Sequence, residues 1–164
     1  PVEAVRTMDN VAIEVESDPT YREVIEASRR VNRQSVADGI VAAAREIAET
    51  ADIKVICCYT ESGTTALLTA RERPRVPILA LTSLLGTARR LALTWGVTCV
   101  MTGELTRFKM AVINAARAAR AHGYATESDQ IVVTAGVPFN IPGTTNILRV
   151  APCQESLIYA TDPG

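Results

Sequence analysis

One stretch, residues 53–71, constrains the fold of this chain more than any other, because a strand-forming run leads through a polar turn directly into a helix-forming run. The run from Ile53 to Tyr59 is apolar, rich in β-branched residues and too short for a stable helix, which predicts a buried strand. Helix formers occupy the positions from Ala66 to Arg71. The turn between the two consists of Thr60, Glu61, Ser62, Gly63, Thr64 and Thr65.

This turn predicts a binding site for an anion, most often a phosphate. A helix that starts directly after a strand presents unpaired backbone N–H groups and the positive end of its dipole at one point. Gly63 lets a ligand approach the backbone, and four hydroxyl groups within six positions exceed what one helix cap requires. The alternative is that Ser62 or Thr64 only caps the helix. The glycine motifs of P-loops and dinucleotide-binding folds do not occur.

Size, charge and cysteine placement restrict the class of protein. A length of 164 residues fits one domain with a short appendage, and a net charge of -1 without a basic cluster argues against a nucleic-acid partner. The apolar runs are strand-sized, so we expect no membrane association, no secretory signal and a cytoplasmic location. Cys57 and Cys58 point to opposite faces of one strand, and no C-x-x-C spacing occurs, which predicts reduced thiols.

Strands and helices alternate along the rest of the chain. The pattern predicts helices from Pro1, over 20–30, from Ser35, over 87–94 and over 105–122, and strands at 53–59, 78–81, 97–101, 131–133 and 146–150. This order indicates a three-layer α/β/α fold with a mixed sheet of about five strands, mostly parallel. The last strand follows a loop too short for a crossover, so we expect it to run antiparallel at the sheet edge, followed by a tail with proline at both ends.

Threonine residues mark one rim of the predicted sheet. Each of the first four strands ends in threonine, at Thr60, Thr82, Thr102 and Thr134. The carboxyl ends of parallel strands meet at the same edge, where ligands of open α/β sheets bind. A loop with two prolines begins at Gly136 and starts from that edge. We therefore expect the loop to fold over whatever the turn binds.

Groups for catalysis are scarce in this sequence. The single histidine, His122, ends an alanine-rich helix just before Gly123, where a solvated residue favoured by the helix dipole is expected. No G-x-S-x-G motif occurs, and no carboxylates are spaced for acid–base work or metal binding. Arginines at 71, 73 and 75 form a basic edge from which one could reach a ligand phosphate. The sequence thus predicts a binding site without evident catalysts.

Several motifs are shared with one known enzyme family. They are P-V-E-A-V, Y-T-E-S-G-T-T-A, A-R-E-R-P-R-V-P-I-L-A-L-T, V-V-T-A-G-V-P and P-G-T-T-N-I-L-R-V. Together they closely resemble the C-terminal domain of pyruvate kinase. Residues 1–33 resemble the last helix of that enzyme's barrel domain with its connecting segment, and residues 34–164 resemble its C-terminal α/β domain. A helix that opens at residue 1 without a methionine also suggests a piece cut from a longer chain.

The resemblance implies a role in a glycolytic phosphotransferase. Pyruvate kinase transfers phosphate between phosphoenolpyruvate and ADP, using Mg and K ions, at a site in its barrel domain. The barrel, with its catalytic lysine and metal-binding carboxylates, is not part of this sequence. We therefore expect no catalytic residue, metal or cofactor in this chain, and no activity from it alone.

The resemblance also implies an allosteric site. In the family, a T-x-S-G-x-[ST] turn binds an effector phosphate, and Thr60, Ser62, Gly63 and Thr65 match it, with Glu61 and Thr64 at its variable positions. A later loop closes over the effector. Its counterpart is residues 136–143, with candidate contacts Gly136, Val137, Pro138, Ile141 and Gly143.

The expected effector and assembly follow from the same resemblance. Members activated by fructose 1,6-bisphosphate hold its second phosphate with a tryptophan and an arginine, where this sequence has Glu104 and Ala111. We therefore expect a sugar monophosphate or a nucleotide monophosphate. The family is tetrameric, so we expect a homo-oligomer in which the last strand pairs with its symmetry mate. The alternatives are a purely structural role in tetramer assembly and an independent phosphatase or isomerase, which lacks catalytic groups.

Overall fold

The structure, a computed structural model, describes residues 1–28, 35–105, 107–139, 141 and 143–161. The chain forms two compact units, Pro1–Arg33 and Gln34–Gly164. The connecting segment that the sequence predicts before residue 34 lies outside the described residues from position 29 onward. No described helix is both long enough and apolar enough to cross a membrane.

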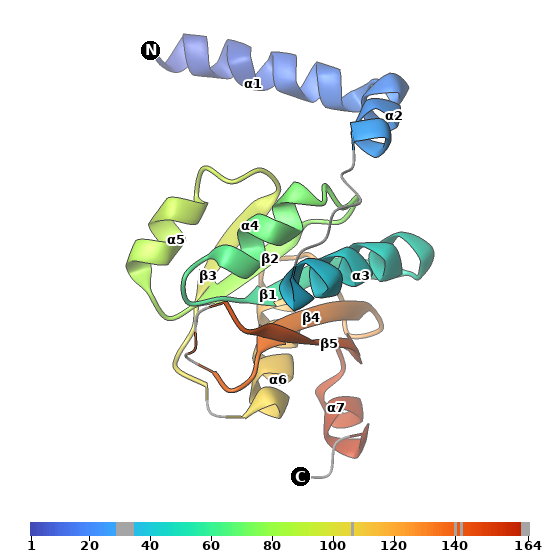
Figure 1. Cartoon of the computed structure of the whole chain (residues 1–164), viewed down its shortest axis with the longest axis vertical. Coiled ribbons are helices and arrows are strands. Elements are labelled where there is room, and N and C mark those ends of the chain that lie inside the picture. The colour runs from blue at the N-terminus through green and yellow to red at the C-terminus, as the bar shows by residue number, and fades with distance from the viewer. Residues whose placement is uncertain (29–34, 106, 140, 142, 162–164) are drawn as a thin grey trace. The chain divides into compact units, whose positions relative to one another are not determined.

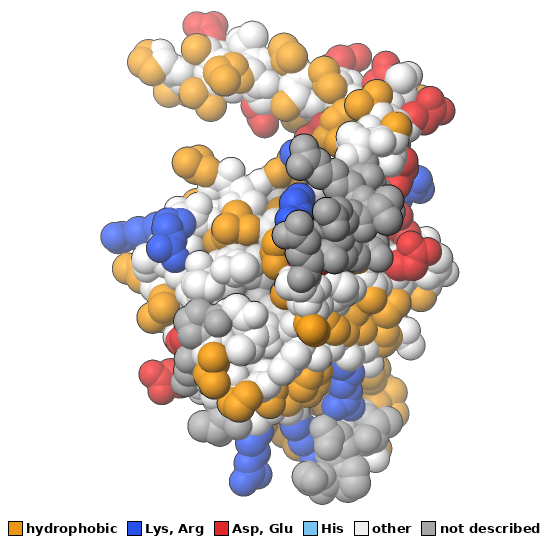
Figure 2. Space-filling view, in the orientation of Figure 1, with side chains coloured by type: hydrophobic (Ala, Val, Ile, Leu, Met, Phe, Trp, Pro, Cys, Tyr) orange, Lys and Arg blue, Asp and Glu red, His pale blue; other side chains and the backbone are white. Residues whose placement is uncertain are grey.

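The first unit consists of two helices, α1 (Val2–Ser17) and α2 (Pro19–Ser28). The break between them is at Asp18, whose carboxylate accepts a 2.7 Å hydrogen bond from the Thr20 amide at the start of α2. Apolar residues recur along α1 at helical spacing, and none of its residues is buried. Figure 2 shows this helix lined with hydrophobic side chains. They include Val2, Val5, Met8, Val11 and Val15, which are between 52% and 71% exposed.

The second unit is built on a five-stranded sheet with the order β3-β2-β1-β4-β5 (Figure 1). Its strands are β1 (Ile53–Tyr59), β2 (Ile78–Thr82), β3 (Val97–Met101), β4 (Gln130–Gly136) and β5 (Thr145–Pro152). The first four strands pair in parallel, whereas β5 runs antiparallel to β4 at the edge. The predicted mixed sheet and the direction of its last strand are confirmed.

Helices cover both faces of this sheet. One face carries α3 (Val36–Thr50), α4 (Thr64–Arg71) and α5 (Leu85–Leu91), and the other carries α6 (Phe108–Ala121) and α7 (Glu155–Thr161). Cys57 packs in the core below α6, and its neighbour Cys58 packs in the core below α3 and α4. All four cysteines are free thiols. The three-layer α/β/α architecture follows directly from this two-sided burial.

Local signals set several helix ends. Ser35 and Asp38 form a reciprocal capping box at the start of α3, with the Asp38 amide donating to the Ser35 hydroxyl at 3.1 Å. At the end of α6, Gly123 adopts a φ of 73°, a left-handed conformation that glycine reaches without strain. Aspartate, although shorter than the usual glutamate, thus completes the capping box.

Two sequence-based expectations are wrong in detail. Residues 155–161 form α7, where the sequence indicated only a tail with proline at both ends. The helix predicted over 87–94 begins at Leu85 and ends at Leu91. Each error lies at a short element or an element end, where tertiary contacts outweigh the local pattern.

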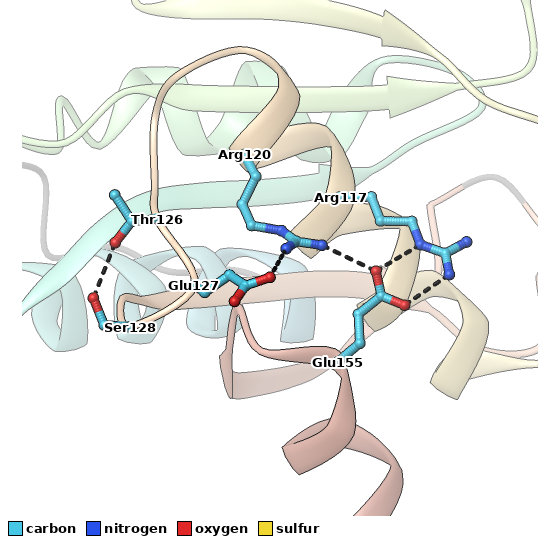
Figure 3. Close-up of polar contacts among 6 residues, drawn as sticks. All are labelled: Arg117, Arg120, Thr126, Glu127, Ser128 and Glu155. Atoms are coloured by element: carbon cyan, nitrogen blue, oxygen red, sulfur yellow. Dashed lines mark hydrogen bonds and ion pairs between the residues drawn. The ribbon is translucent and has the colours of Figure 1, made fainter.

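An ion-pair network explains why α7 forms (Figure 3). The Glu155 carboxylate in its first turn accepts hydrogen bonds from Arg117 Nε at 2.8 Å and Nη2 at 2.7 Å, and from Arg120 Nη2 at 3.0 Å. Arg120 also donates to Glu127 at 2.7 Å. With Ile158 buried in the core, these contacts hold a seven-residue helix that would be marginal alone.

This network predicts a pH-dependent contribution to stability. Hydrogen bonds from Arg117 lower the pKa of Glu155 in the folded chain. The stabilisation is therefore present above the unfolded pKa, about 4.3, and is lost as the pH falls through the lower folded pKa. We expect Glu155→Gln to lower the free energy of unfolding at pH 7 by about 1 kcal/mol, measured by urea denaturation. The difference should shrink on acidification, whereas Glu46→Gln on the exposed side of α3 should change little at either pH.

Candidate functional site

A hollow opens at the carboxyl ends of β1, β2 and β3, next to the loop that joins β4 to β5. It contains about 580 Å³ of space between its walls, a part of which is open to solvent. Its lining comes from four segments of the chain: Tyr59, Thr60, Glu61, Ser62 and Thr65; Leu81, Thr82 and Ser83; Thr102, Gly103, Glu104 and Leu105; and Gly136, Phe139, Ile141, Gly143, Thr144 and Thr145.

Most of the predicted turn and loop residues meet at this hollow. Thr60, Glu61, Ser62 and Thr65 line it, as do Gly136, Ile141 and Gly143 from the loop. The lining does not include Gly63, Thr64, Val137 or Pro138. Positions 140 and 142 of the loop lie outside the described residues.

The predicted threonine rim is present at three of its four positions. Thr60, Thr82 and Thr102 line the hollow. Thr134 does not, because β4 continues to Gly136 and leaves the Thr134 side chain buried inside the sheet. The expectation that Thr134 ends its strand is therefore wrong. An apolar run alone did not reveal the two further residues of β4, Ala135 and Gly136.

Glycine is required at the turn for backbone geometry. Gly63 occupies the N-cap position of α4 with a φ of 88°, and it has no side chain to cap this helix. The Gly63 amide donates to the Thr60 hydroxyl at 2.9 Å, which closes the turn on itself. The Ser62 and Thr64 hydroxyls lie 2.9 Å apart. The Thr64 amide, at the start of α4, also donates to the Ser62 hydroxyl at 3.4 Å, so the alternative in which Ser62 caps the helix stays open.

Side-chain hydrogen bonds attach the loop to the turn and to its own base. The Thr65 hydroxyl lies 2.6 Å from that of Thr145, joining α4 to the start of β5. Asn146 exchanges two hydrogen bonds with the backbone of Val137, at 2.9 and 2.6 Å. A Cβ atom at Gly136 would lie only 2.6 Å from the Thr144 hydroxyl oxygen, so the loop can approach the strand this closely only at a glycine.

Two contacts of the turn come from α5 and were not predicted from the sequence. The Thr87 hydroxyl donates to the Glu61 carbonyl at 2.5 Å, and Arg90 Nη2 donates to the Ser62 carbonyl at 3.1 Å. The arginines considered from the sequence lie elsewhere: Arg71 pairs with Asp38, and Arg73 stacks over the Trp95 ring at 4.3 Å. No local pattern distinguishes Arg90 from Arg89, because the distinction depends on how α5 packs against the turn.

The charged lining of the hollow is acidic. Glu61 and Glu104 line it, and its described lining includes no lysine or arginine. Ala111, a residue of α6, is buried in the core between that helix and the sheet. Among the described residues, no three His, Cys, Asp or Glu side chains cluster as a metal site.

Comparison with known proteins identifies the family. A family profile described as "Pyruvate kinase, alpha/beta domain" matches residues 38–151, which is most of the second unit. The chain belongs to the pyruvate kinase family. Its motifs at residues 59–66 and 132–138 lie within the matched range, as does the whole of the hollow's described lining.

Bacterial pyruvate kinases are similar to this chain along almost all of its length. That of Methylorubrum extorquens is 39% identical over 151 residues, covering 92% of this chain and 32% of the relative. One from Agrobacterium vitis is 39% identical over 150 residues, covering 92% and 31%. The chain therefore spans about a third of the length of these pyruvate kinases.

Solved pyruvate kinases share the fold. A crystal structure from Cryptosporidium parvum superposes with a TM-score of 0.70 at 25% identity, covering 82% of this chain and 26% of that one. A second structure of the Cryptosporidium parvum enzyme, in complex with ADP, gives a TM-score of 0.70 at 27% identity, covering 82% and 27%. The similarity confirms the three-layer fold of this pyruvate kinase domain.

Alanine substitutions at Gly63 in the turn and at Gly39 in α3 should change the free energy of unfolding in opposite directions. Gly63→Ala should lower the free energy of unfolding by about 1–2 kcal/mol, because its φ of 88° is left-handed and strained for alanine. Gly39→Ala should raise it by up to about 1 kcal/mol, because Gly39 lies inside α3 with nothing within 4 Å of a Cβ atom. Urea denaturation of both variants checks the signs, and two changes of the same sign would contradict the assignment.

Proposed function

We propose that this chain is the regulatory C-terminal domain of a pyruvate kinase and that its hollow binds a phosphorylated effector. One observation carries the proposal: Thr60, Ser62 and Thr65 of the family's T-x-S-G-x-[ST] turn line the same hollow as the loop after β4. Ligands of open α/β sheets bind at this end of the strands. The site joins a hydroxyl-rich turn, a helix N-terminus and a loop that reaches α4 through Thr145.

The effector phosphate binds at the turn. The Thr60 hydroxyl accepts a hydrogen bond from the Gly63 amide, which leaves its own hydrogen able to donate to a phosphate oxygen. Ser62 supplies a second hydroxyl, which also accepts a 3.4 Å hydrogen bond from the Thr64 amide, and the first turn of α4 supplies further backbone N–H groups. The positive end of the helix dipole adds a favourable field for an anion.

The effector is a sugar monophosphate or a nucleotide monophosphate. Glu104 lines the hollow beyond the end of β3, and the described lining offers no cation there to hold a second phosphate. A bisphosphate would place additional negative charge near this carboxylate, which is unfavourable where water is partly excluded. Hydroxyl groups of a sugar, in contrast, donate hydrogen bonds to a carboxylate.

The chemistry of the parent enzyme takes place outside this chain. A pyruvate kinase transfers phosphate between phosphoenolpyruvate and ADP with Mg and K ions, and the residues for this step belong to its barrel domain. Residues 1–33 are the last barrel helix with its connecting segment. The exposed apolar face of α1 packs against the remainder of that domain, since an amphipathic helix needs a partner for its apolar stripe.

A purely structural role in assembly is the second candidate. Among the described strands, β5 pairs with β4 alone and forms one edge of the sheet. Such an edge can pair with the same strand of a second copy about a two-fold axis, because antiparallel strands satisfy this symmetry. In this candidate the domain only assembles the tetramer and binds no effector.

Removing the turn hydroxyls tests the regulatory role. The Thr60→Ala, Ser62→Ala double variant should bind glucose 6-phosphate, ribose 5-phosphate or AMP at least tenfold more weakly by calorimetry, since two hydrogen bonds to a charged phosphate are lost. Thr50→Ala is the control, because the Thr50 hydroxyl bonds only within α3, to the Glu46 carbonyl, and does not line the hollow. It should change affinity less than twofold.

The same titration decides the class of effector. The wild-type chain should bind a monophosphate more tightly than fructose 1,6-bisphosphate, and the reverse order would contradict the role given to Glu104. Absence of binding by every phosphate ester tested would leave only the structural role.

The proposed strand pairing predicts self-association. The 164-residue chain should sediment as a dimer or larger species, with a fraction that grows with protein concentration. Sedimentation velocity over a concentration series checks this. A single monomer boundary at the highest concentration would exclude the pairing for the isolated chain.

A further inference from the structure

The hollow presents an electrostatic problem for the proposed ligand. A phosphate monoester carries up to two negative charges near neutral pH, and the described lining holds the carboxylates of Glu61 and Glu104 without a lysine or arginine. Backbone amides and hydroxyls supply only partial positive charge. A site of this kind needs a cation close to the turn, even if that cation does not form its wall.

Arg90 of α5 is a cation that contacts the turn directly. Its Nη2 donates to the Ser62 carbonyl at 3.1 Å and to the Thr87 hydroxyl at 3.1 Å. Thr87 in turn donates to the Glu61 carbonyl at 2.5 Å. Figure 2 shows basic side chains gathered on the surface over α5. Two successive carbonyls of the turn are thus held by one helix.

These contacts orient the backbone amides of the turn. In a trans peptide the carbonyl and the following N–H point in opposite directions. Because the carbonyls of Glu61 and Ser62 point to α5, the amides of Ser62 and Gly63 point away from it. The hydrogen bond from the Gly63 amide to the Thr60 hydroxyl, at 2.9 Å, agrees with this orientation.

We propose that Arg90 is the charged positioning residue of the phosphate site, holding the Ser62 carbonyl and supplying the positive charge that the hollow lacks. This inference rests on the proposed binding of a phosphate monoester. The guanidinium lies on the side of the turn that faces α5. The amides of Ser62 and Gly63 face the opposite side. The guanidinium therefore attracts the anion through the turn, keeps the Ser62 amide aimed at it, and holds the Gly63 amide on the Thr60 hydroxyl that donates to it.

A separate observation indicates that the hollow takes a polar ligand. Tyr59 lines it and is only 7% exposed, and its hydroxyl oxygen makes no hydrogen bond of standard geometry, although the Thr102 side chain lies close enough to interact with it. Burial raises the pKa of this hydroxyl, so it retains its proton and can act as a donor. Buried polar atoms without partners are uncommon in native proteins. A polar ligand at this end of the sheet would supply a hydrogen-bond partner of standard geometry.

A simpler explanation for Arg90 is that it only stabilises α5. Comparison with its neighbour Arg89 distinguishes this explanation from a role at the turn. Arg89 and Arg90 both lie in the last turn of α5, where a cation stabilises the negative end of the helix dipole. Both side chains are exposed, and both carry one positive charge. Of the two, only Arg90 donates hydrogen bonds to the described turn and to Thr87. Arg89→Gln is therefore a matched control for charge and helix position.

The test is calorimetric titration of the 164-residue chain with glucose 6-phosphate and with inorganic phosphate, at low and at high salt. We expect Arg90→Gln to weaken glucose 6-phosphate binding about tenfold at low salt, which corresponds to about 1.4 kcal/mol. The difference should narrow at high salt, because this exposed charge is screened. Arg89→Gln should change affinity less than twofold, and Arg90→Lys, which keeps the charge, should bind more tightly than Arg90→Gln.

Each contrary result has a distinct meaning. Equal losses from Arg89→Gln and Arg90→Gln would overturn the inference, since only the overall charge of α5 would then matter. Binding by Arg90→Lys no better than by Arg90→Gln would also overturn it, since the charge would then contribute nothing. Wild-type protein that binds neither sugar phosphates nor inorganic phosphate would instead overturn the proposed function on which the inference rests. Melting temperatures of all variants, measured without ligand, separate unfolding from weakened binding.

Discussion

The central position of β1 is the constraint on which the arrangement of the domain depends. It pairs in parallel with β2 on one side and β4 on the other, and every residue except Lys54 is buried. A strand held on both edges and both faces ends at a defined point, so the turn that follows it has little freedom. The ends of β2 and β3 and the loop after β4 reach the hollow at the same edge, because these strands are parallel to β1.

Most of the sheet could be predicted from the sequence, because its strands are apolar runs separated by polar, glycine- or proline-bearing segments. The antiparallel direction of β5 followed from the short loop before it. The tail helix α7 could not be predicted in this way, because its first turn is held by Arg117 and Arg120, which lie far earlier in the chain. Such ion pairs appear only when the elements that carry them are packed together.

The candidate site likewise contains some residues that a local sequence pattern predicts and others that only tertiary packing brings together. Its turn has a local pattern of hydroxyls and glycine that indicates an anion site even without knowledge of the family. The role of α5 is not local: Thr87 and Arg90 contact Glu61 and Ser62 only because α4 and α5 cover the same face of the sheet. Thr134 shows a different kind of error. The sequence predicted that it ends its strand, but β4 continues for two more residues, so Thr134 lies inside the strand.

The strand order also has a consequence for how the chain must fold. Ile56 pairs with Ile78 soon after both are synthesised, but its other neighbour, Val132, arrives only after β3 and α6. Until then one edge of β1 carries unpaired backbone groups beside apolar side chains, a surface that readily joins a second chain. The connectivity that brings a loop to the hollow therefore makes this edge the part of the nascent domain most liable to misassociation.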